Sequence, residues 1–330
     1  MQQASLTKCL SKTLLFVALP LVSLTLAQDP QPTPPNPKSL QLQLSTQHSA
    51  ATFRLSGQPD WLAISEDTVW VSNGPLKAVQ RIAADTNEFT RKIDFPAEPC
   101  SGLVFAFGTL WVPLCGDQPA IARVSPTTNK ITAILPFGPA DDEGGITANE
   151  DSIWLASGKP AALLRIDPAT NTVRQKIAVP PGCANPLYAD GVVWVSCNQS
   201  GVLTAVDTRT GEVLASIPVG PQPRFLTAGA GSIWTLNQGD GTITRVDVRT
   251  RRAVASIAAG ISGHGGEITF GAGSVWATLI NIPLTQISPT TNTVVHQWTG
   301  PGGDAVRFGH DSLWLTHLRG GLLWRLSPPK

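Results

Sequence analysis

Five acidic and imidazole side chains are the residues of this sequence best suited to chemistry. They lie about ten residues before, or a few residues after, a recurring tryptophan, and they are Asp60, His264, Glu267, Asp304 and His317. Imidazoles grouped with carboxylates can bind a divalent metal or transfer protons. Glu267, His264 and Asp304 are therefore candidate metal ligands, and His264, Glu267 and His317 are candidate catalytic residues. The alternative is that these polar loop residues line a hydrated channel without chemistry.

Other polar residues in equivalent loops are candidates for holding a ligand. With two of the residues above, the ligand-binding candidates are Asp60, Glu143, Asn185, Arg224, Asp304 and Arg319. Glu143 ends an acidic run that is more typical of a solvated loop than of a Ca²⁺ site, because the alternation of an EF-hand is missing. The glycines between residues 260 and 267 would let the backbone approach a ligand closely. The sequence has no nucleophile elbow, P-loop or His-Glu-x-x-His motif.

The elements that must position these residues repeat with the tryptophan. The repeated residues are Trp70, Trp111, Trp154, Trp194, Trp234, Trp276 and Trp314, at intervals of 41, 43, 40, 40, 42 and 38 residues. Each unit holds four short apolar or alternating runs separated by turn residues, as in the hairpin turn Asp190-Gly191. A period near forty with four strands per unit predicts an all-β fold, a seven-bladed β-propeller. The tryptophans are expected to pack between blades and not to form a binding cage.

The two ends of the repeat predict how the ring closes. The last unit stops at residues 327–330, where its fourth strand should begin, and the run Ala51–Leu55 can supply that strand. An N-terminal strand that completes the last blade would protect an otherwise exposed edge. Closure makes blades 6, 7 and 1 neighbours, so we expect the five residues of the opening paragraph to share one sector of the channel mouth.

Composition and the N-terminal segment restrict the class of protein. Only 14% of the residues are charged and the net charge is +1, which argues against a nucleic-acid partner. Residues 1–27 have the basic, apolar and small-residue regions of a signal peptide, with mature protein expected from Gln28. Residues 28–48 are expected to be a Pro-rich disordered leader, and residues 49–330 the propeller. With no further stop-transfer segment, we expect an exported monomer, periplasmic or secreted, without a membrane span.

Four cysteines follow the leader in two pairs. Each pair brackets one predicted hairpin, so antiparallel pairing should bring Cys100 opposite Cys115 and Cys183 opposite Cys197. Two disulfides are therefore favoured, and an oxidising compartment agrees with them. The alternative, a four-thiolate metal site, would normally show CxxC spacing, which is missing.

The repeat units resemble a known group of propellers. Ser152-Ile153-Trp154-Leu155, then Leu164-Arg165-Ile166-Asp167-Pro168, is similar to units of the YVTN-type and virginiamycin B lyase-like propellers of bacterial exported proteins. The resemblance covers residues 50–330. It implies the propeller fold and, from the lyase, a Mg²⁺ site with a Glu-x-His element. Here Glu267-Ile268-Thr269 has the Glu with Thr in place of His, and Glu143-Gly144-Gly145 also has no His.

Two functions remain open at this stage. The first is an exported propeller without a complete catalytic set, which binds an unknown small molecule or protein at its channel mouth. The second is a metal-dependent lyase or hydrolase, virginiamycin B lyase-like or lactonase-like, in the sector of blades 6, 7 and 1. No motif demands a cofactor, and a divalent metal (Mg²⁺ or Ca²⁺) is the one that this sector could hold.

Overall fold

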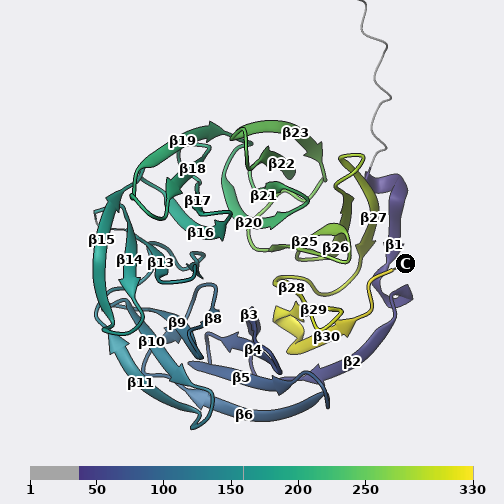
Figure 1. The fold of residues 1–330 in the computed structure, drawn as a ribbon. Coiled ribbons are helices and arrows are strands. Elements are labelled where there is room, and N and C mark those ends of the chain that lie inside the picture. The colour runs from purple at the N-terminus through teal and green to yellow at the C-terminus, as the bar shows by residue number, and fades with distance from the viewer. Residues whose placement is uncertain (1–36, 159, 330) are drawn as a thin grey trace, which may run out of the picture. The chain divides into compact units, whose positions relative to one another are not determined.

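The computed structural model describes residues 37–158 and 160–329. In this part of the chain, seven sheets are arranged as blades around a central axis, and each blade has an inner strand near the axis and an outer strand at the circumference (Figure 1). The predicted fold, a seven-bladed β-propeller of antiparallel four-stranded blades, is confirmed.

The blades follow one another in chain order. Blades 1 and 2 contain β3 (Pro59–Ile64), β4 (Thr68–Asn73), β5 (Ala78–Ala83), β6 (Glu88–Asp94), β7 (Glu98–Pro99), β8 (Val104–Ala106), β9 (Thr109–Cys115), β10 (Ala120–Ser125) and β11 (Lys130–Leu135). Blades 3 and 4 contain β12 (Ile146–Ala148), β13 (Ile153–Ser157), β14 (Ala162–Asp167), β15 (Thr172–Ala178), β16 (Cys183–Ala189), β17 (Val192–Cys197), β18 (Val202–Asp207) and β19 (Val213–Pro218). Blades 5 and 6 contain β20 (Pro223–Gly229), β21 (Ser232–Asn237), β22 (Thr242–Asp247), β23 (Arg252–Ala258), β24 (Ile268–Gly271), β25 (Ser274–Leu279), β26 (Ile282–Ser288) and β27 (Thr293–Thr299). Blade 7 contains β28 (Val306–Gly309), β29 (Ser312–His317), the 3-10 helix η3 (Leu318–Gly320), β30 (Leu322–Leu326) and β2 (Ser49–Arg54).

The ring closes as predicted from the two ends of the repeat. Strand β2 pairs antiparallel with β30, and Phe53 lies opposite Leu323. The N-terminal strand thus becomes the outer strand of the last blade (Figure 1). Because both partners lose an exposed edge, closure removes a site at which another chain could pair.

The segment before β2 differs from the expected disordered leader. From residue 37 onwards it forms η1 (Pro37–Leu40), β1 (Gln41–Gln43) and η2 (Leu44–Thr46). Strand β1 pairs in parallel with β27, the outer strand of blade 6. The expectation of disorder is therefore wrong for this part, because the edge of β27 offers backbone partners that a Pro-rich composition does not reveal. The expected signal peptide and residues 28–36 lie outside the described residues.

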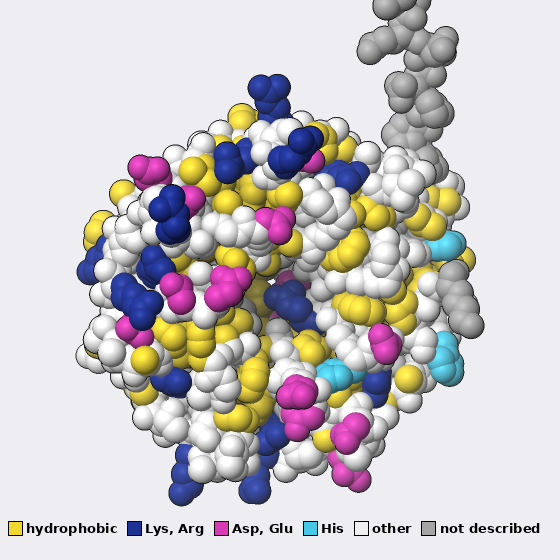
Figure 2. Space-filling view, viewed as in Figure 1, with side chains coloured by type: hydrophobic (Ala, Val, Ile, Leu, Met, Phe, Trp, Pro, Cys, Tyr) yellow, Lys and Arg dark blue, Asp and Glu magenta, His cyan; other side chains and the backbone are white. Residues whose placement is uncertain are grey.

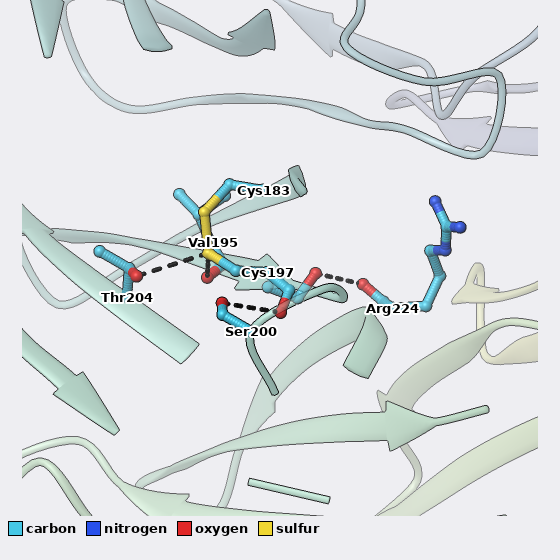
Figure 3. The surroundings of a disulfide bond; sticks show 7 residues. Cys183, Val195, Cys197, Ser200, Thr204 and Arg224 are labelled. Carbon is cyan, nitrogen blue, oxygen red and sulfur yellow. Dashed lines mark hydrogen bonds between the residues drawn. A yellow bond between two sulfur atoms is a disulfide. The ribbon is translucent and has the colours of Figure 1, made fainter. Parts of the chain in front are cut away.

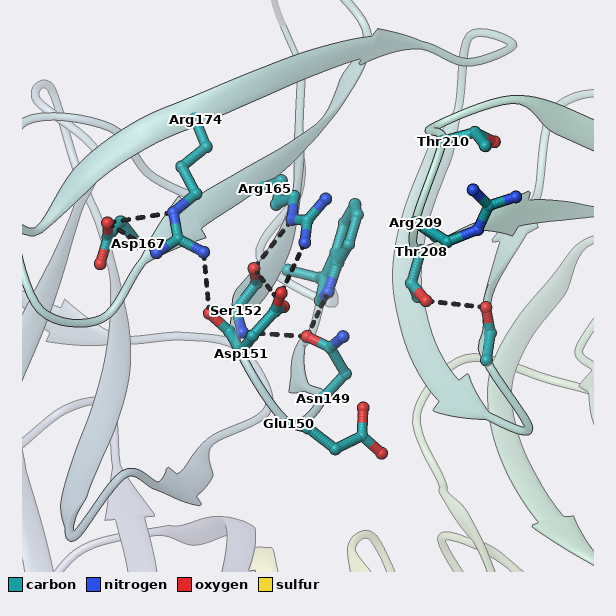
Figure 4. Close-up of polar contacts among 12 residues, drawn as sticks. Asn149, Glu150, Asp151, Ser152, Arg165, Asp167, Arg174, Thr208, Arg209 and Thr210 are labelled. Atoms are coloured by element: carbon teal, nitrogen blue, oxygen red, sulfur yellow. Dashed lines mark hydrogen bonds and ion pairs between the residues drawn. The ribbon is translucent and has the colours of Figure 1, made fainter.

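The seven repeated tryptophans are completely buried between blades, as expected. Over five of them lies an arginine from the next strand, with its guanidinium carbon 4.8–5.4 Å from the ring centroid, a cation–π distance. Arg165 also donates to Ser152 and to Asp151, at 2.9 Å and 2.8 Å (Figure 4). Other arginines of this set reach the next blade: Arg245 donates to the side-chain oxygen of Asn292 at 2.9 Å. These contacts hold neighbouring blades in register.

Both predicted disulfides are present. Cys100 is bonded to Cys115, and Cys183 is bonded to Cys197 (Figure 3). Cys183 begins the inner strand β16 and Cys197 ends β17, whereas Cys100 lies between the short strands β7 and β8 and Cys115 ends β9. The disulfides thus fix the inner segments of blades 2 and 4 to the strands beside them. In the described residues, no helix is long and apolar enough to cross a membrane.

Candidate functional site

The site begins where the inner strands start, at one end of the central channel. The register of β3 on β4 shifts between Pro59 and Leu62, and that of β20 on β21 shifts between Pro223 and Phe225. Such irregularities bend a strand and re-aim its side chains. As a result, the consecutive residues Asp60 and Trp61 both line the same small cavity.

Four carboxyl groups from four different blades meet at this cavity. Its lining residues are Asp60, Trp61, Glu143, Gly266, Glu267, Asp304 and Ala305. We call Asp60, Glu143, Glu267 and Asp304 the carboxyl cluster. The cavity has a volume of about 10 Å³, which is space for one water molecule or one ion. Basic and acidic side chains gather in the hollow at the centre of the ring in Figure 2.

Hydrogen bonds from neighbouring blades fix the two most buried carboxyls. Asp304 accepts from the backbone N–H of Gly266 at 3.1 Å, and Glu267 accepts from the N–H of Val306 at 3.1 Å. Arg307 forms an ion pair with the other oxygen of Glu267. These two acids thus join blades 6 and 7, because the carboxyl of each accepts a hydrogen bond from a backbone amide next to the other acid.

Burial and crowding raise the pKa of every member of the carboxyl cluster. Burial raises the pKa of Glu267 to about 7, although Arg307 opposes the rise. Burial, followed by the charge of Asp304, raises the pKa of Glu143 to about 7. The pKa of Asp60 is raised well above its ordinary value by burial and by Asp304, with which it shares a hydrogen bond, and burial raises the pKa of Asp304. Burial and mutual repulsion therefore disfavour the state in which all four carboxyls are ionised, although Arg307 and Arg224 favour the charged forms of Glu267 and Glu143.

An aromatic pair spans the channel beside the cluster. Trp61 of blade 1 and Phe225 of blade 5 are buried, and their ring centroids are 5.5 Å apart with an edge-to-face arrangement. These blades are not neighbours in the ring, so the pair crosses the channel. A β-carbon at Gly102 would lie 3.7 Å from the Trp61 ring, which shows how closely the indole approaches blade 2. Because Trp61 also lines the cavity, this aromatic pair forms an apolar floor beside the carboxyls.

The loop of residues 138–145 lies across the mouth. It joins β11 to β12 and carries Glu143 to the carboxyl cluster. Asp141 forms an ion pair with Arg224 of blade 5 at 2.9 Å. Burial alone would raise the pKa of Asp141, but the amide of Glu143 and the guanidinium of Arg224 hold it below its ordinary value. Asn185 of blade 4 donates to the carbonyl oxygen of Glu143 at 2.8 Å.

The structure brings together some of the predicted site residues and separates others. Asp60, Glu267 and Asp304 meet in the cluster, as the shared sector suggested, whereas Asn185 and Arg224 contact the loop that brings Glu143 to it. The two histidines and Arg319 do not line this cavity. His264 and Arg319 are exposed. His317 instead stacks on Trp324, with ring centroids 5.4 Å apart.

The predicted metal set of Glu267, His264 and Asp304 is therefore not assembled. Gly263, Gly265 and Gly266 all have positive φ, and the tight turn that they form leaves His264 on the solvent side. Among the residues that the structure describes, no group of three or more His, Cys, Asp and Glu is arranged to hold a metal ion.

Sequence reasoning missed Arg307 and the aromatic pair. Arg307 stands seven residues before its blade's tryptophan. The residues at the same position in blades 1 to 6 are uncharged, and they are Ala63, Val104, Thr147, Leu187, Thr227 and Thr269. A single charged residue in a series of uncharged ones was the feature of the sequence that could have pointed to Arg307. Trp61 and Phe225 occupy equivalent positions nine residues before the tryptophan, so their pairing across the channel could have been suspected.

Comparison with known proteins identifies the fold. Neither protein-family models nor curated protein sequences gave a match to the chain. Among solved structures, a streptogramin B lyase is similar with a TM-score of 0.69 and 20% identity, over 84% of this chain and 96% of the lyase chain. BamB from Moraxella catarrhalis is similar with a TM-score of 0.62 and 10% identity, over 85% of this chain and 97% of that chain. The resemblance to the lyase-like propellers is thereby confirmed for the fold.

Proposed function

We propose that this chain is an exported binding propeller whose carboxyl cluster receives a cationic group of a small-molecule or protein ligand. The observation that carries the proposal is the charge balance of the cluster. Arg307 pairs with Glu267, which leaves Asp60, Glu143 and Asp304 without an ion-pair partner in the described part of the chain. Three carboxyls from three blades thus converge without an ion pair of their own, and the only cation among the described residues that acts on them is Arg224, which lowers the pKa of Glu143 but is itself paired with Asp141.

An ammonium or guanidinium group would satisfy this arrangement. Burying a carboxylate without a partner is costly, so the cluster binds protons near neutral pH instead. A cation with several N–H donors can replace those protons and bond to several carboxylates at once. The floor formed by Trp61 and Phe225 would lie under the ligand and exclude water, which strengthens such contacts.

Calorimetric titration with putrescine tests this proposal. Butanediol and succinate, of similar length but neutral and anionic, are the ligand controls. We expect a heat of binding for putrescine but not for butanediol or succinate. We also expect the Asp304→Asn variant, which keeps the shape of the side chain, to lose putrescine binding. Asp240→Asn is the matched control, because Asp240 is exposed in the turn after β21 and accepts bonds from the neighbouring Thr242. Equal heats from the diol and the diamine, or full binding by Asp304→Asn, would refute the proposal.

A second candidate is a metal-dependent lyase or hydrolase. Two observations favour it: the fold is similar to a streptogramin B lyase, and Glu143 and Glu267 have a pKa of about 7, which suits general acid–base chemistry. Carboxylates are ligands that Mg²⁺ and Ca²⁺ accept. The imidazole of a Glu-x-His element is replaced by Thr269, whose hydroxyl accepts from the N–H of Phe308 at 3.3 Å.

Metal analysis and one substrate separate the two candidates. If the second holds, purified protein binds Mg²⁺ or Ca²⁺, Glu267→Ala loses the metal, and a streptogramin B antibiotic is converted in the presence of Mg²⁺. If Glu267→Ala leaves the metal content unchanged, or if the antibiotic persists with Mg²⁺ present, this candidate fails.

Export is part of the proposal and has its own support. Two disulfides stand in this chain, and such bonds persist in oxidising compartments. N-terminal sequencing of the protein recovered from the periplasm or medium should begin at Gln28. Recovery of the whole protein from the cytoplasm with Met1 intact would contradict export.

A further inference from the structure

The loop of residues 138–145, here called the lid loop, is attached to three other blades. Its tip is held by contacts from blades 2, 4 and 5, which are Ser101 Oγ to Asp141 O at 3.1 Å, Gly102 N to Gly144 O at 3.1 Å, Gly145 N to Ala184 O at 3.1 Å, Asn185 Nδ2 to Glu143 O at 2.8 Å and Arg224 Nη1 to Asp141 Oδ2 at 2.9 Å. Loops of a propeller ordinarily contact the blades beside them. This loop instead spans the mouth.

The outer flank of the lid loop faces free space. A cleft of about 710 Å³ between blades 2 and 3 is lined by residues 138–140 together with Asp117 and Lys176. The loop therefore packs on the mouth from one side and borders solvent-filled volume on the other. The free volume lies at the base of the loop, where Ala140 N–H donates to Ala156 O at 2.9 Å, and the tip, residues 141–145, does not line this cleft.

The ion pair that attaches the lid loop to blade 5 leaves one donor of its arginine without a hydrogen-bond partner among the described residues. The Arg224–Asp141 ion pair joins side chains that are 12% and 30% exposed. The Nε of Arg224 is buried and has no hydrogen-bond partner in the described residues (the side chain is drawn in Figure 3). A buried donor without an acceptor reduces the net gain from this contact, because its desolvation is not repaid.

We propose that the lid loop opens and closes over the carboxyl cluster, and that release from Arg224 withdraws Glu143 and admits the cationic group of the ligand. This inference rests on the proposed function. The cavity in the closed arrangement has room for one water or ion only, so an organic cation needs the loop to move.

Both disulfides adjoin residues that contact the lid loop. Cys100 precedes Ser101, and Cys183 precedes the segment of Ala184 and Asn185, so each bonded cysteine adjoins residues that hold the loop. The two crosslinked blades are the neighbours of blade 3, from which the loop extends. They thus keep the anchors in place while the loop itself has no crosslink.

The raised pKa of Glu143 makes closure of the lid loop depend on pH. The groups that face Glu143 are Asp304, Arg224, Asp142 and Asp141, and Asp60 lies in the same cluster. Burial and Asp304 raise the pKa of Glu143 to about 7, from an ordinary value of 4.5. The closed state therefore binds a proton that an open, solvated Glu143 would release, and opening is favoured as the pH rises through this interval.

Hydrogen exchange of the free protein tests the lid loop without any ligand. In Arg224→Met, and in Asp141→Asn from the other side of the pair, amides of residues 141–145 should exchange at least about tenfold faster, the effect of one lost ionic hydrogen bond. Strands β13 and β14 of the same blade should keep their wild-type exchange. Arg174→Met is the control, because it breaks the exposed Arg174–Asp167 pair on the outer side of blade 3.

Two results would overturn the inference. The first is unchanged exchange of residues 141–145 in both variants, and the second is an equal acceleration in β13 and β14, which would mean general loosening of the blade. If the exchange test fails, the putrescine titration still tests whether the carboxyl cluster binds a cation. Conversely, if the lid loop opens as expected but the protein does not bind putrescine, the proposed ligand is wrong and the proposed movement stands.

Discussion

Replacement of Glu267 by Gln should change how the stability of the propeller depends on pH. Glu267 is 2% exposed, and burial raises its pKa from 4.5 to about 7. Between these values the folded state holds a proton that the unfolded state has lost, so this carboxyl lowers the free energy of unfolding as the pH rises. At 1.36 kcal/mol per pH unit, the loss between pH 5 and pH 8 is about 2.5 kcal/mol. Gln cannot ionise, so the variant lacks this loss.

Urea unfolding of both proteins at pH 5 and pH 8, followed by tryptophan fluorescence, measures the effect. The variant also loses the ion pair with Arg307, which contributes an offset, but its stability relative to wild type should rise by about 2.5 kcal/mol from pH 5 to pH 8. Glu212→Gln is the control, because Glu212 is exposed and its replacement should give no such change. If Glu267→Gln and wild type show the same pH dependence, the assignment of a buried, proton-binding carboxyl is wrong.

Three further predictions concern the scaffold around the site. Arg245→Leu removes a guanidinium over the blade 5 tryptophan and its bond to Asn292, and should lower the free energy of unfolding in urea by about 2 kcal/mol; an unchanged midpoint would show that these inter-blade contacts do not stabilise the ring. Replacing Cys183 and Cys197 together by Ser should cost up to about 3 kcal/mol and lower the Tm, and a Tm equal to wild type would contradict a stabilising crosslink. Trp61→Ala should cost about 3–5 kcal/mol while the far-ultraviolet circular dichroism stays that of a propeller; a cost below 1 kcal/mol would mean that the channel floor is not packed.

The fold could be predicted because one residue type repeats in a fixed strand position. Burial of Trp70 and its six equivalents is what a blade interface requires, and their spacing sets the position of every strand around them. The cysteine pairs followed from the same register, since residues equally distant from a hairpin turn lie opposite each other. The pairing of β1 with β27 could not be predicted, because it depends on a free strand edge that exists only in the assembled ring.

The site was predicted in part, for reasons that lie in its geometry. Equivalent positions in neighbouring blades brought Asp60 and Asp304 together without any motif. The place of Glu143 could not be inferred, because a loop that crosses the channel leaves no periodic signal, and an acidic run is ordinarily solvated. The prediction for His264 was wrong because closeness in sequence to Glu267 does not fix the direction of a side chain in a glycine-rich turn.

The most direct test of the central claim is a putrescine titration by calorimetry at pH 6 and pH 8, in two buffers of different ionisation enthalpy. Because burial and Asp304 raise the pKa of Glu143 to about 7, and Glu267 is already paired with Arg307, the cation must displace the proton of Glu143 at pH 6. We predict binding about tenfold tighter at pH 8, with proton release at pH 6 that shows as a difference in heat between the buffers. The absence of binding at both pH values, or an affinity that is the same at both with no proton release, would contradict the account of a cation-receiving carboxyl cluster.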